Sequence, residues 1–124
     1  MHVVAVVIED IKTVADLIKI HLEHQGFTVY TTQSGVEGIR LAKEHKPDVV
    51  LLDLGLPDID GRQVCAELKR SVETAQIPIV VVTAKSGDVE RILTRVTGAD
   101  GFLSKPFHLQ ELTDKISQVM SQAS

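Results

Sequence analysis

The fold of this chain is decided by residues 49–61, which read Val49-Val50-Leu51-Leu52-Asp53-Leu54-Gly55-Leu56-Pro57-Asp58-Ile59-Asp60-Gly61. Four consecutive aliphatic residues, two of them β-branched, suit a strand that is covered on both faces. Pro57 and Gly61 then stop the chain before the next helical pattern. The stretch predicts a buried strand that carries Asp53 at its carboxyl end. Taken alone, Asp53 would be interpreted as an aspartate that caps a turn, as Asp residues commonly do; the polar residues at the ends of three other strands favour a functional site instead.

The composition fits one domain with an aliphatic core. The chain has 124 residues, of which 44% are hydrophobic and only 3% aromatic, and its net charge is -4. We expect the domain to span residues 1–120 and residues 121–124 to be a polar tail or the start of a linker. The negative charge argues against direct nucleic-acid binding by this domain.

Targeting signals and disulfides are not expected either. No apolar run approaches the roughly 20 residues that a membrane span needs, and the N-terminus lacks the pattern of a secretory signal. The sequence therefore predicts a cytoplasmic protein with no membrane contact. The single cysteine, Cys65, excludes an internal disulfide, and its place on a helical face predicts that it packs as a small hydrophobe.

Strand and helix patterns alternate five times along the chain. Short apolar or alternating runs predict strands at residues 3–8, 27–31, 49–53, 79–82 and 101–105. Apolar residues spaced by three and four predict a helix after each strand, with inward faces made by Val14, Leu17, Ile18 and Leu22 in the first and by Val36, Ile39 and Ala42 in the second. The later helices are predicted at residues 61–71, 88–97 and 109–120. This alternation predicts an α/β fold, a parallel sheet with helices on both faces.

Polar residues follow four of the predicted strands: Glu9 and Asp10, Asp53, Thr83, and Lys105. In an open parallel sheet the binding crevice lies beyond the carboxyl ends of the strands, so these residues should form one site. Carboxylates crowded on one rim repel each other unless a divalent cation or a shared proton holds them together. Hard oxygen ligands favour Mg²⁺, which leaves coordination positions to water and phosphate.

This set of residues suits phosphoryl chemistry. Asp53, supplied by a rigid strand, can attack phosphorus and form an acyl phosphate. A bound cation and Lys105 would offset charge on the phosphoryl oxygens. Thr83 offers a hydroxyl to one of those oxygens, and Ala84 beside it leaves room.

With these residues in place, the chain resembles the receiver domain of two-component response regulators over nearly its whole length. The matching motifs are the acidic pair Glu9-Asp10, the phosphoacceptor Asp53, the hydroxyl and small neighbour Thr83-Ala84, the Lys105-Pro106-Phe107 signature, the switch aromatic Phe102, and Gly55, whose backbone carbonyl completes the metal shell in the family. The resemblance implies a (βα)5 flavodoxin-like, doubly wound sheet with strand order 2-1-3-4-5. It also implies a cis bond between Lys105 and Pro106.

The resemblance implies function as well. A sensor histidine kinase or a small phosphodonor would phosphorylate Asp53, with Mg²⁺ or Mn²⁺ held by Glu9, Asp10, Asp53 and the Gly55 carbonyl. Thr83 and Phe102 would be the switch pair that reshapes the face made by helix 4, strand 5 and helix 5. That face would signal to an output domain or an effector protein.

Some positions depart from the usual family pattern. Glu9 stands where an aspartate is frequent, and Phe102 replaces the common tyrosine and has no hydroxyl. Arg91 and Glu111 could pair across a homodimer face, but Gly101 stands where a second acid is common, so only a weak homodimer is expected.

Other functions fit the residues less well. A flavin-type cofactor binder needs a phosphate loop where residues 9–11 are Glu-Asp-Ile, and a phosphatase needs a second acid where Gly55 stands. A pseudo-receiver would keep the fold without the chemistry, but Asp53, Thr83 and Lys105 are all present. The sequence therefore favours a phosphorylation-controlled signalling switch that modifies only itself, not a turnover enzyme.

Overall fold

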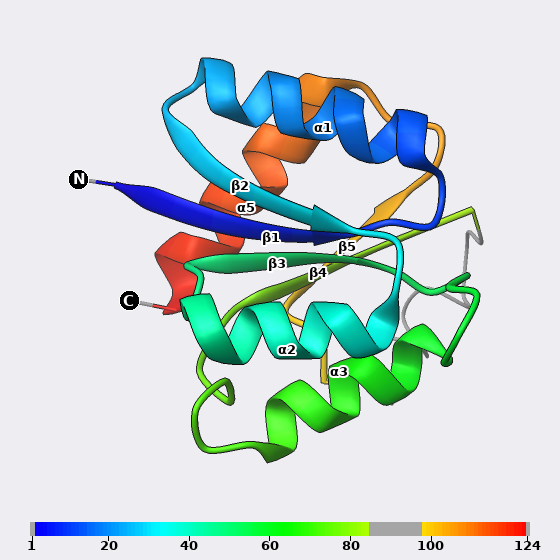
Figure 1. The fold of residues 1–124 in the computed structure, drawn as a ribbon. Helices are drawn as coiled ribbons and strands as arrows, with labels where there is room; N and C mark the ends of the chain where they lie inside the picture. The colour runs from blue at the N-terminus through cyan, green and yellow to red at the C-terminus, as the bar shows by residue number, and fades with distance from the viewer. Residues whose placement is uncertain (1, 85–97, 124) are drawn as a thin grey trace.

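Five parallel strands form the centre of the protein, seen in a computed structural model that describes residues 2–84 and 98–123 (Figure 1). The strands are β1 Val3–Ile8, β2 Phe27–Thr32, β3 Val49–Asp53, β4 Ile79–Thr83 and β5 Gly101–Ser104. The helices are α1 Lys12–His24, α2 Gly35–His45, α3 Gly61–Arg70 and α5 Leu109–Ala123. The strand order β2-β1-β3-β4-β5 confirms the predicted doubly wound sheet. The helix predicted over residues 88–97 lies outside the described residues.

Helices cover both faces of the sheet. Helices α1 and α5 lie on one face and α2 and α3 on the other (Figure 1). Because successive side chains of a strand point to opposite faces, Val7 packs in the core under α1 and α5, whereas Val6 packs in the core that includes Val64 of α3. Every residue of β3 and of β4 is buried, as expected for central strands without polar alternation.

Helix α2 meets the sheet through most of the predicted face, because Ala42 is buried and the half-buried Ile39 packs against the core, but Val36 does not. Val36 was expected to point inward, but it is 59% exposed, and the buried positions include Gly38, Leu41 and Ala42. A Cβ on Gly38 would lie only 2.4 Å from Cδ1 of Ile8, so the missing side chain lets the helix approach β1 closely. A glycine has no apolar side chain, so the hydrophobic pattern did not indicate that Gly38 faces the sheet and that Val36 does not.

Smaller differences concern exposure and the ends of elements. Leu17 was expected on the inner face of α1 but is 58% exposed. The predicted polar tail is helical up to Ala123, so α5 ends later than expected, while β5 ends at Ser104, one residue before Lys105. Cys65 is fully buried, as predicted. No helix among the described residues is long and apolar enough to cross a membrane.

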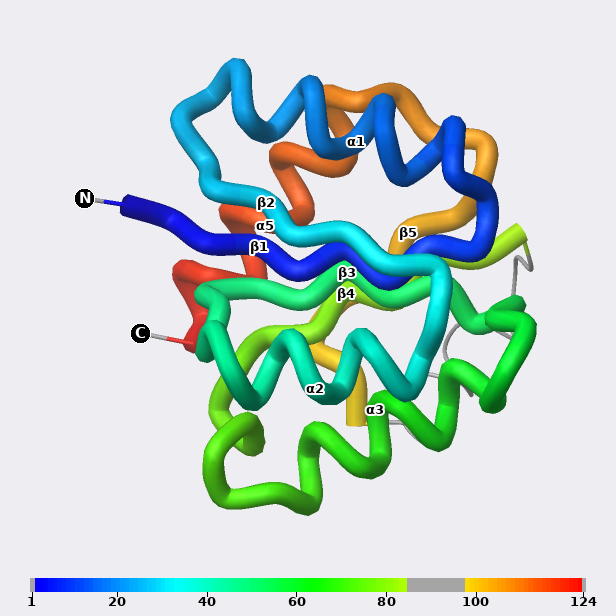
Figure 2. The backbone as a smooth tube through the Cα atoms, viewed as in Figure 1, coloured from blue at the N-terminus to red at the C-terminus, as the bar shows by residue number. Residues whose placement is uncertain are grey.

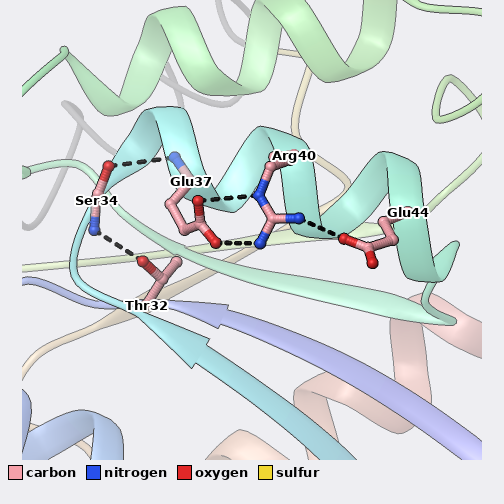
Figure 3. A network of polar contacts seen from close by, with 5 residues as sticks. All are labelled: Thr32, Ser34, Glu37, Arg40 and Glu44. Atoms are coloured by element: carbon pink, nitrogen blue, oxygen red, sulfur yellow. Dashed lines mark hydrogen bonds and ion pairs between the residues drawn. The ribbon is translucent and has the colours of Figure 1, made fainter.

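The turn from β2 into α2 is fixed by side-chain hydrogen bonds. Ser34 caps the helix because its Oγ accepts from the backbone N–H of Glu37 at 3.2 Å, and its own N–H donates to Oγ1 of Thr32 at 3.1 Å (Figure 3). Arg40 pairs with Glu37 and Glu44 along the exposed side of the helix (Figure 3). Figure 2 shows this turn at the same end of the sheet as the segment that joins β3 to α3.

Candidate functional site

The carboxyl ends of the strands surround one cleft of about 570 Å³. It is lined by Ile11, Asp53, Leu54, Gly55, Leu56, Asp60, Arg62, Thr83, Ala84 and Lys105. Asp53 is the last residue of β3 and Thr83 the last of the neighbouring strand β4, while Lys105 directly follows β5. The predicted gathering of these residues at one edge is therefore confirmed.

Lys105 joins the two buried acids of the rim. Its Nζ lies 2.9 Å from Oε1 of Glu9 and 3.3 Å from Oδ2 of Asp53. Glu9 is 2% exposed and Asp53 9%, so both carboxyl groups are largely removed from water. The bond between Lys105 and the following proline is cis, as the resemblance implied.

Backbone groups fix the other oxygens of these acids. Oδ1 of Asp53 accepts from the N–H of Gly55 at 3.0 Å, and Oε2 of Glu9 accepts from the N–H of Ile11 at 3.1 Å. The turn-capping role considered for Asp53 is thus real, but it engages only one oxygen. The other oxygen, Oδ2, is the one that Lys105 reaches.

The two acids have opposite protonation tendencies. Burial raises the pKa of Glu9, and a hydrogen bond with Asp53 raises it further. Burial also acts to raise the pKa of Asp53, but hydrogen bonds from Glu9 and from the Gly55 N–H, together with Lys105, hold that pKa below its ordinary value. Burial works against the charge of Lys105, yet the two carboxylates raise its pKa. The rim thus favours an ionised Asp53 beside a Glu9 that binds its proton more tightly than usual.

The donor set fits Mg²⁺ in part. Asp53 and Gly55 line the cleft, and the buried Glu9 contacts Lys105 of that lining. All three residues offer the hard oxygen atoms that Mg²⁺ prefers. Asp10 is half-buried, and its backbone carbonyl accepts from Nε2 of Gln33 at 2.8 Å. Within residues 2–84 and 98–123, no three acidic, histidine or cysteine side chains already form a metal-binding group. Asp10 as a metal ligand stays a prediction.

The predicted switch residues lie on neighbouring strands. Thr83 is 5% exposed and lines the cleft. Phe102 is half-buried, is paired in register with Val81 of β4, and packs against the core that lies under α2 and α3. It also lines a second depression, shared with α5 residues such as Glu111 and Lys115. The contribution of helix 4 to this face, with Arg91, lies outside the described residues.

Two charged residues at the cleft, Asp60 and Arg62, were not predicted from the sequence. Asp60 caps α3 by accepting from the N–H of Arg62 at 2.9 Å, and it pairs with the Arg62 guanidinium at 2.7 Å. The acid before Gly61 was a readable helix-start signal. Arg62 gave no such signal, because an arginine in the first turn of a helix is ordinarily a solvated surface residue.

Comparison with known proteins identifies the family. The family model of the response regulator receiver domain matches residues 5–117. The chain belongs to this family of two-component signalling domains.

Solved structures agree over the whole chain. A response regulator structure from Chloroflexus aurantiacus superposes with a TM-score of 0.91 at 28% identity, covering 98% of this chain and 99% of that one. The chemotaxis protein CheY4 of Vibrio cholerae gives 0.90 at 21% identity, covering 96% and 99%. A receiver domain of a sensor histidine kinase from Pseudomonas aeruginosa gives 0.88 at 24% identity, covering 98% and 99%, and its structure holds a magnesium ion in the active site cleft.

Proposed function

We propose that this receiver domain is a switch that accepts a phosphoryl group on Asp53. The observation that carries the proposal is the contact of Lys105 with both Asp53 and Glu9 at a buried rim. A lysine that holds an ionised carboxylate there favours nucleophilic attack by that carboxylate, because the proton that would block attack is kept off Asp53. The self-modification is stoichiometric, so the protein is not a turnover enzyme.

The proposed step transfers phosphorus from the donor to Asp53. Oδ2 of Asp53 forms the new O–P bond as the bond between phosphorus and the donor's leaving atom breaks, and the leaving group takes the bonding electron pair. The Gly55 N–H holds Oδ1 and so orients the carboxylate. Lys105 then contacts the phosphoryl oxygens, which carry the negative charge, and the Thr83 hydroxyl donates a hydrogen bond to one of them. Mg²⁺ held by Glu9, Asp10, Asp53 and the Gly55 carbonyl would neutralise further charge on those oxygens.

The donor is proposed to be the phosphohistidine of a sensor kinase or a small acyl phosphate. Beside the cleft lies an apolar groove of about 460 Å³. It is lined by Val14, Leu17, Ile18, Ala84, Lys105, Pro106, Phe107 and Leu109. Leu17 is 58% exposed and Ile11, at the cleft itself, is 50% exposed. Exposed apolar side chains that flank a reactive site favour docking of a protein donor there. Because both kinds of donor act in the cytoplasm, we propose that the protein functions there.

The output is proposed to run through Thr83 and Phe102. A phosphoryl group on Asp53 favours the conformation in which Thr83 contacts it. The side chain of Phe102, on the neighbouring strand β5, then changes its position. The reshaped surface includes β5 and α5 and would bind an output domain or an effector. We propose at most a weak homodimer through this surface. Thr83→Ala should then abolish the phosphorylation-dependent NMR shifts around Phe102, and unchanged shifts would contradict this coupling.

Mass spectrometry of the intact protein tests the function directly. The protein is incubated with acetyl phosphate, with Mg²⁺ or with EDTA, beside Asp53→Asn and the control Asp48→Asn, which removes a carboxylate at the opposite edge of the sheet. We expect one added phosphoryl group that requires Mg²⁺, is retained in Asp48→Asn and is absent in Asp53→Asn. A folded protein that gains no phosphoryl group from acetyl phosphate or from any histidine kinase would instead be a pseudo-receiver that acts without phosphorylation.

A further inference from the structure

The loop between β3 and α3, residues 54–60, shapes the cleft but is held from outside it. Leu54, Gly55, Leu56 and Asp60 of this loop line the cleft, whereas Asp58 does not. The Asp58 carboxylate instead contacts the beginning of α2, where it receives three hydrogen bonds. Oδ1 accepts from the N–H of Gly35 at 2.9 Å, and Oδ2 accepts from the Ser34 hydroxyl at 2.8 Å and from the N–H of Val36 at 3.1 Å.

These bonds are strong for a physical reason. The first turn of a helix has backbone N–H groups without partners inside the helix, and the helix dipole favours negative charge there. The N–H groups of Gly35 and Val36 accordingly hold the pKa of Asp58 well below its usual range. The carboxylate therefore stays ionised at neutral pH, and charge-assisted hydrogen bonds tie the loop to α2.

Apolar packing fixes the same junction independently. A Cβ on Gly35 would lie 2.7 Å from Cγ1 of Ile59 and 3.1 Å from Cδ1 of Leu56, so the loop already touches the backbone of α2. Ser34 is itself held by Thr32 and by the N–H of Glu37 (Figure 3). The anchor for the loop is thus a turn whose position is determined by β2 and α2, not by the cleft.

We propose that Asp58 is a positioning residue for the metal and phosphoryl site. By holding the loop against α2, it places Gly55 beside Asp53, with the Gly55 N–H on Oδ1 of Asp53 and the Gly55 carbonyl available to a divalent cation. This inference rests on the proposed function. It adds that the affinity for Mg²⁺ depends on a carboxylate that never contacts the ion.

Calorimetric titration with Mg²⁺ tests the inference on four proteins: wild type, Asp58→Ala, Asp58→Asn and Asp48→Ala. Asp48 is a matched control because its Oδ2 also accepts from a backbone N–H, that of Val4 at 2.8 Å, but at the amino end of β3, away from the cleft. Residues that support metal ligands typically change metal affinity about 10-fold or more. We expect a loss of about 10-fold in Asp58→Ala and less than about 2-fold in Asp48→Ala.

Asp58→Asn separates position from charge. The asparagine removes the charge but keeps one acceptor oxygen for α2, so we expect an intermediate loss of about 3-fold. The amide NMR signal of Gly55 in the metal-free protein should shift in Asp58→Ala and stay in place in Asp48→Ala. If circular dichroism shows Asp58→Ala to be unfolded, Asp58→Asn carries the same comparison.

Several outcomes would overturn the inference. Wild-type affinity in Asp58→Ala, or in Asp58→Asn where that variant replaces it, would show that the loop holds its position without this carboxylate. An Asp58→Asn protein that binds Mg²⁺ as weakly as Asp58→Ala, while its Gly55 amide signal stays at the wild-type position, would assign the effect to charge and not to the position of the loop. A wild-type protein that neither binds Mg²⁺ nor accepts a phosphoryl group would remove the proposed function itself, and this result differs from a failure of Asp58 alone.

Discussion

Gly61, the first residue of α3, should not tolerate a side chain, because the backbone that carries the phosphoacceptor lies directly behind it. A Cβ at this position would lie 2.6 Å from the Cα of Leu54 and 2.7 Å from the carbonyl oxygen of Asp53. Ordinary van der Waals contact begins near 3.4 Å, so the two segments must separate by about 0.8 Å. Both atoms belong to the backbone, and no side-chain rotation can relieve the contact.

The magnitude follows from two opposing effects of Gly61→Ala. Overpacking of this kind costs about 1–3 kcal/mol. Because Gly61 has no positive φ, alanine fits its conformation and gains about 0.4–1 kcal/mol from the reduced entropy of the unfolded chain. The free energy of unfolding should therefore fall by about 1–2 kcal/mol, which lowers Tm by about 4–8 °C in a domain of this size. A shift of the Asp53 backbone should also slow phosphorylation by acetyl phosphate about 10-fold.

Two other glycines provide controls for Gly61→Ala. At Gly55 the nearest atom to an added Cβ is Oδ1 of Asp53 at 3.8 Å, so Gly55→Ala should leave Tm unchanged or slightly higher in the same thermal unfolding assay. At Gly101 the Cβ would lie 2.7 Å from Cγ1 of Val119, so Gly101→Ala should destabilise the protein without moving Asp53. Unfolding of Gly61→Ala at the wild-type temperature, or equally slow phosphorylation of Gly101→Ala, would contradict a close contact of Gly61 with the Asp53 backbone.

The remaining predictions concern the half-buried Lys69 and the buried Glu9. Nζ of Lys69 donates to the carbonyl of Ile77 at 3.0 Å and to Oδ2 of Asp100 at 2.8 Å. Lys69→Met should therefore lower the free energy of unfolding, measured in urea, by about 1–2 kcal/mol. The control Arg70→Met breaks an exposed ion pair with Glu67 and should change the free energy of unfolding by less than about 0.5 kcal/mol. Burial raises the pKa of Glu9 above its ordinary 4.5, so the folded metal-free protein binds this proton more tightly than the unfolded chain, and stability in EDTA should gain a contribution as pH falls from 7 toward 4.5. Glu9→Gln should lose that contribution, and identical pH profiles would contradict the environment described for Glu9.

The parallel arrangement of the strands and the composition of the rim could be predicted from local sequence patterns, whereas the strand order was implied by the family resemblance. The continuous apolar runs before Asp53 and Thr83 indicated buried parallel strands, and parallel strands place their carboxyl ends at one edge. The position of Lys105 after the last strand followed from the same logic. These residues meet because the strands are parallel, and a parallel sheet can be predicted from the alternation of strands and helices.

Contacts that depend on close approach could not be predicted in this way. The apolar pattern placed Val36 on the inner face of α2, but Gly38 lets that helix approach Ile8, and a pattern of hydrophobic residues does not register the absence of a side chain. Leu17 was likewise expected on the inner face of α1, but it is exposed. The periodicity of hydrophobic residues identifies the apolar face of a helix. How much of that face is buried depends on the strands and helices that pack against it.

That an acid, a hydroxyl and a lysine meet at one edge of a parallel sheet could be predicted from the sequence alone. The structure was needed to show that Lys105 contacts both Glu9 and Asp53, and that Asp58 lies outside the cleft lining and contacts the first turn of α2. The physical reason is that hydrogen bonds act over about 3 Å. Whether two groups so far apart in the chain come that close is set by the packing of whole helices and loops, which no local pattern encodes.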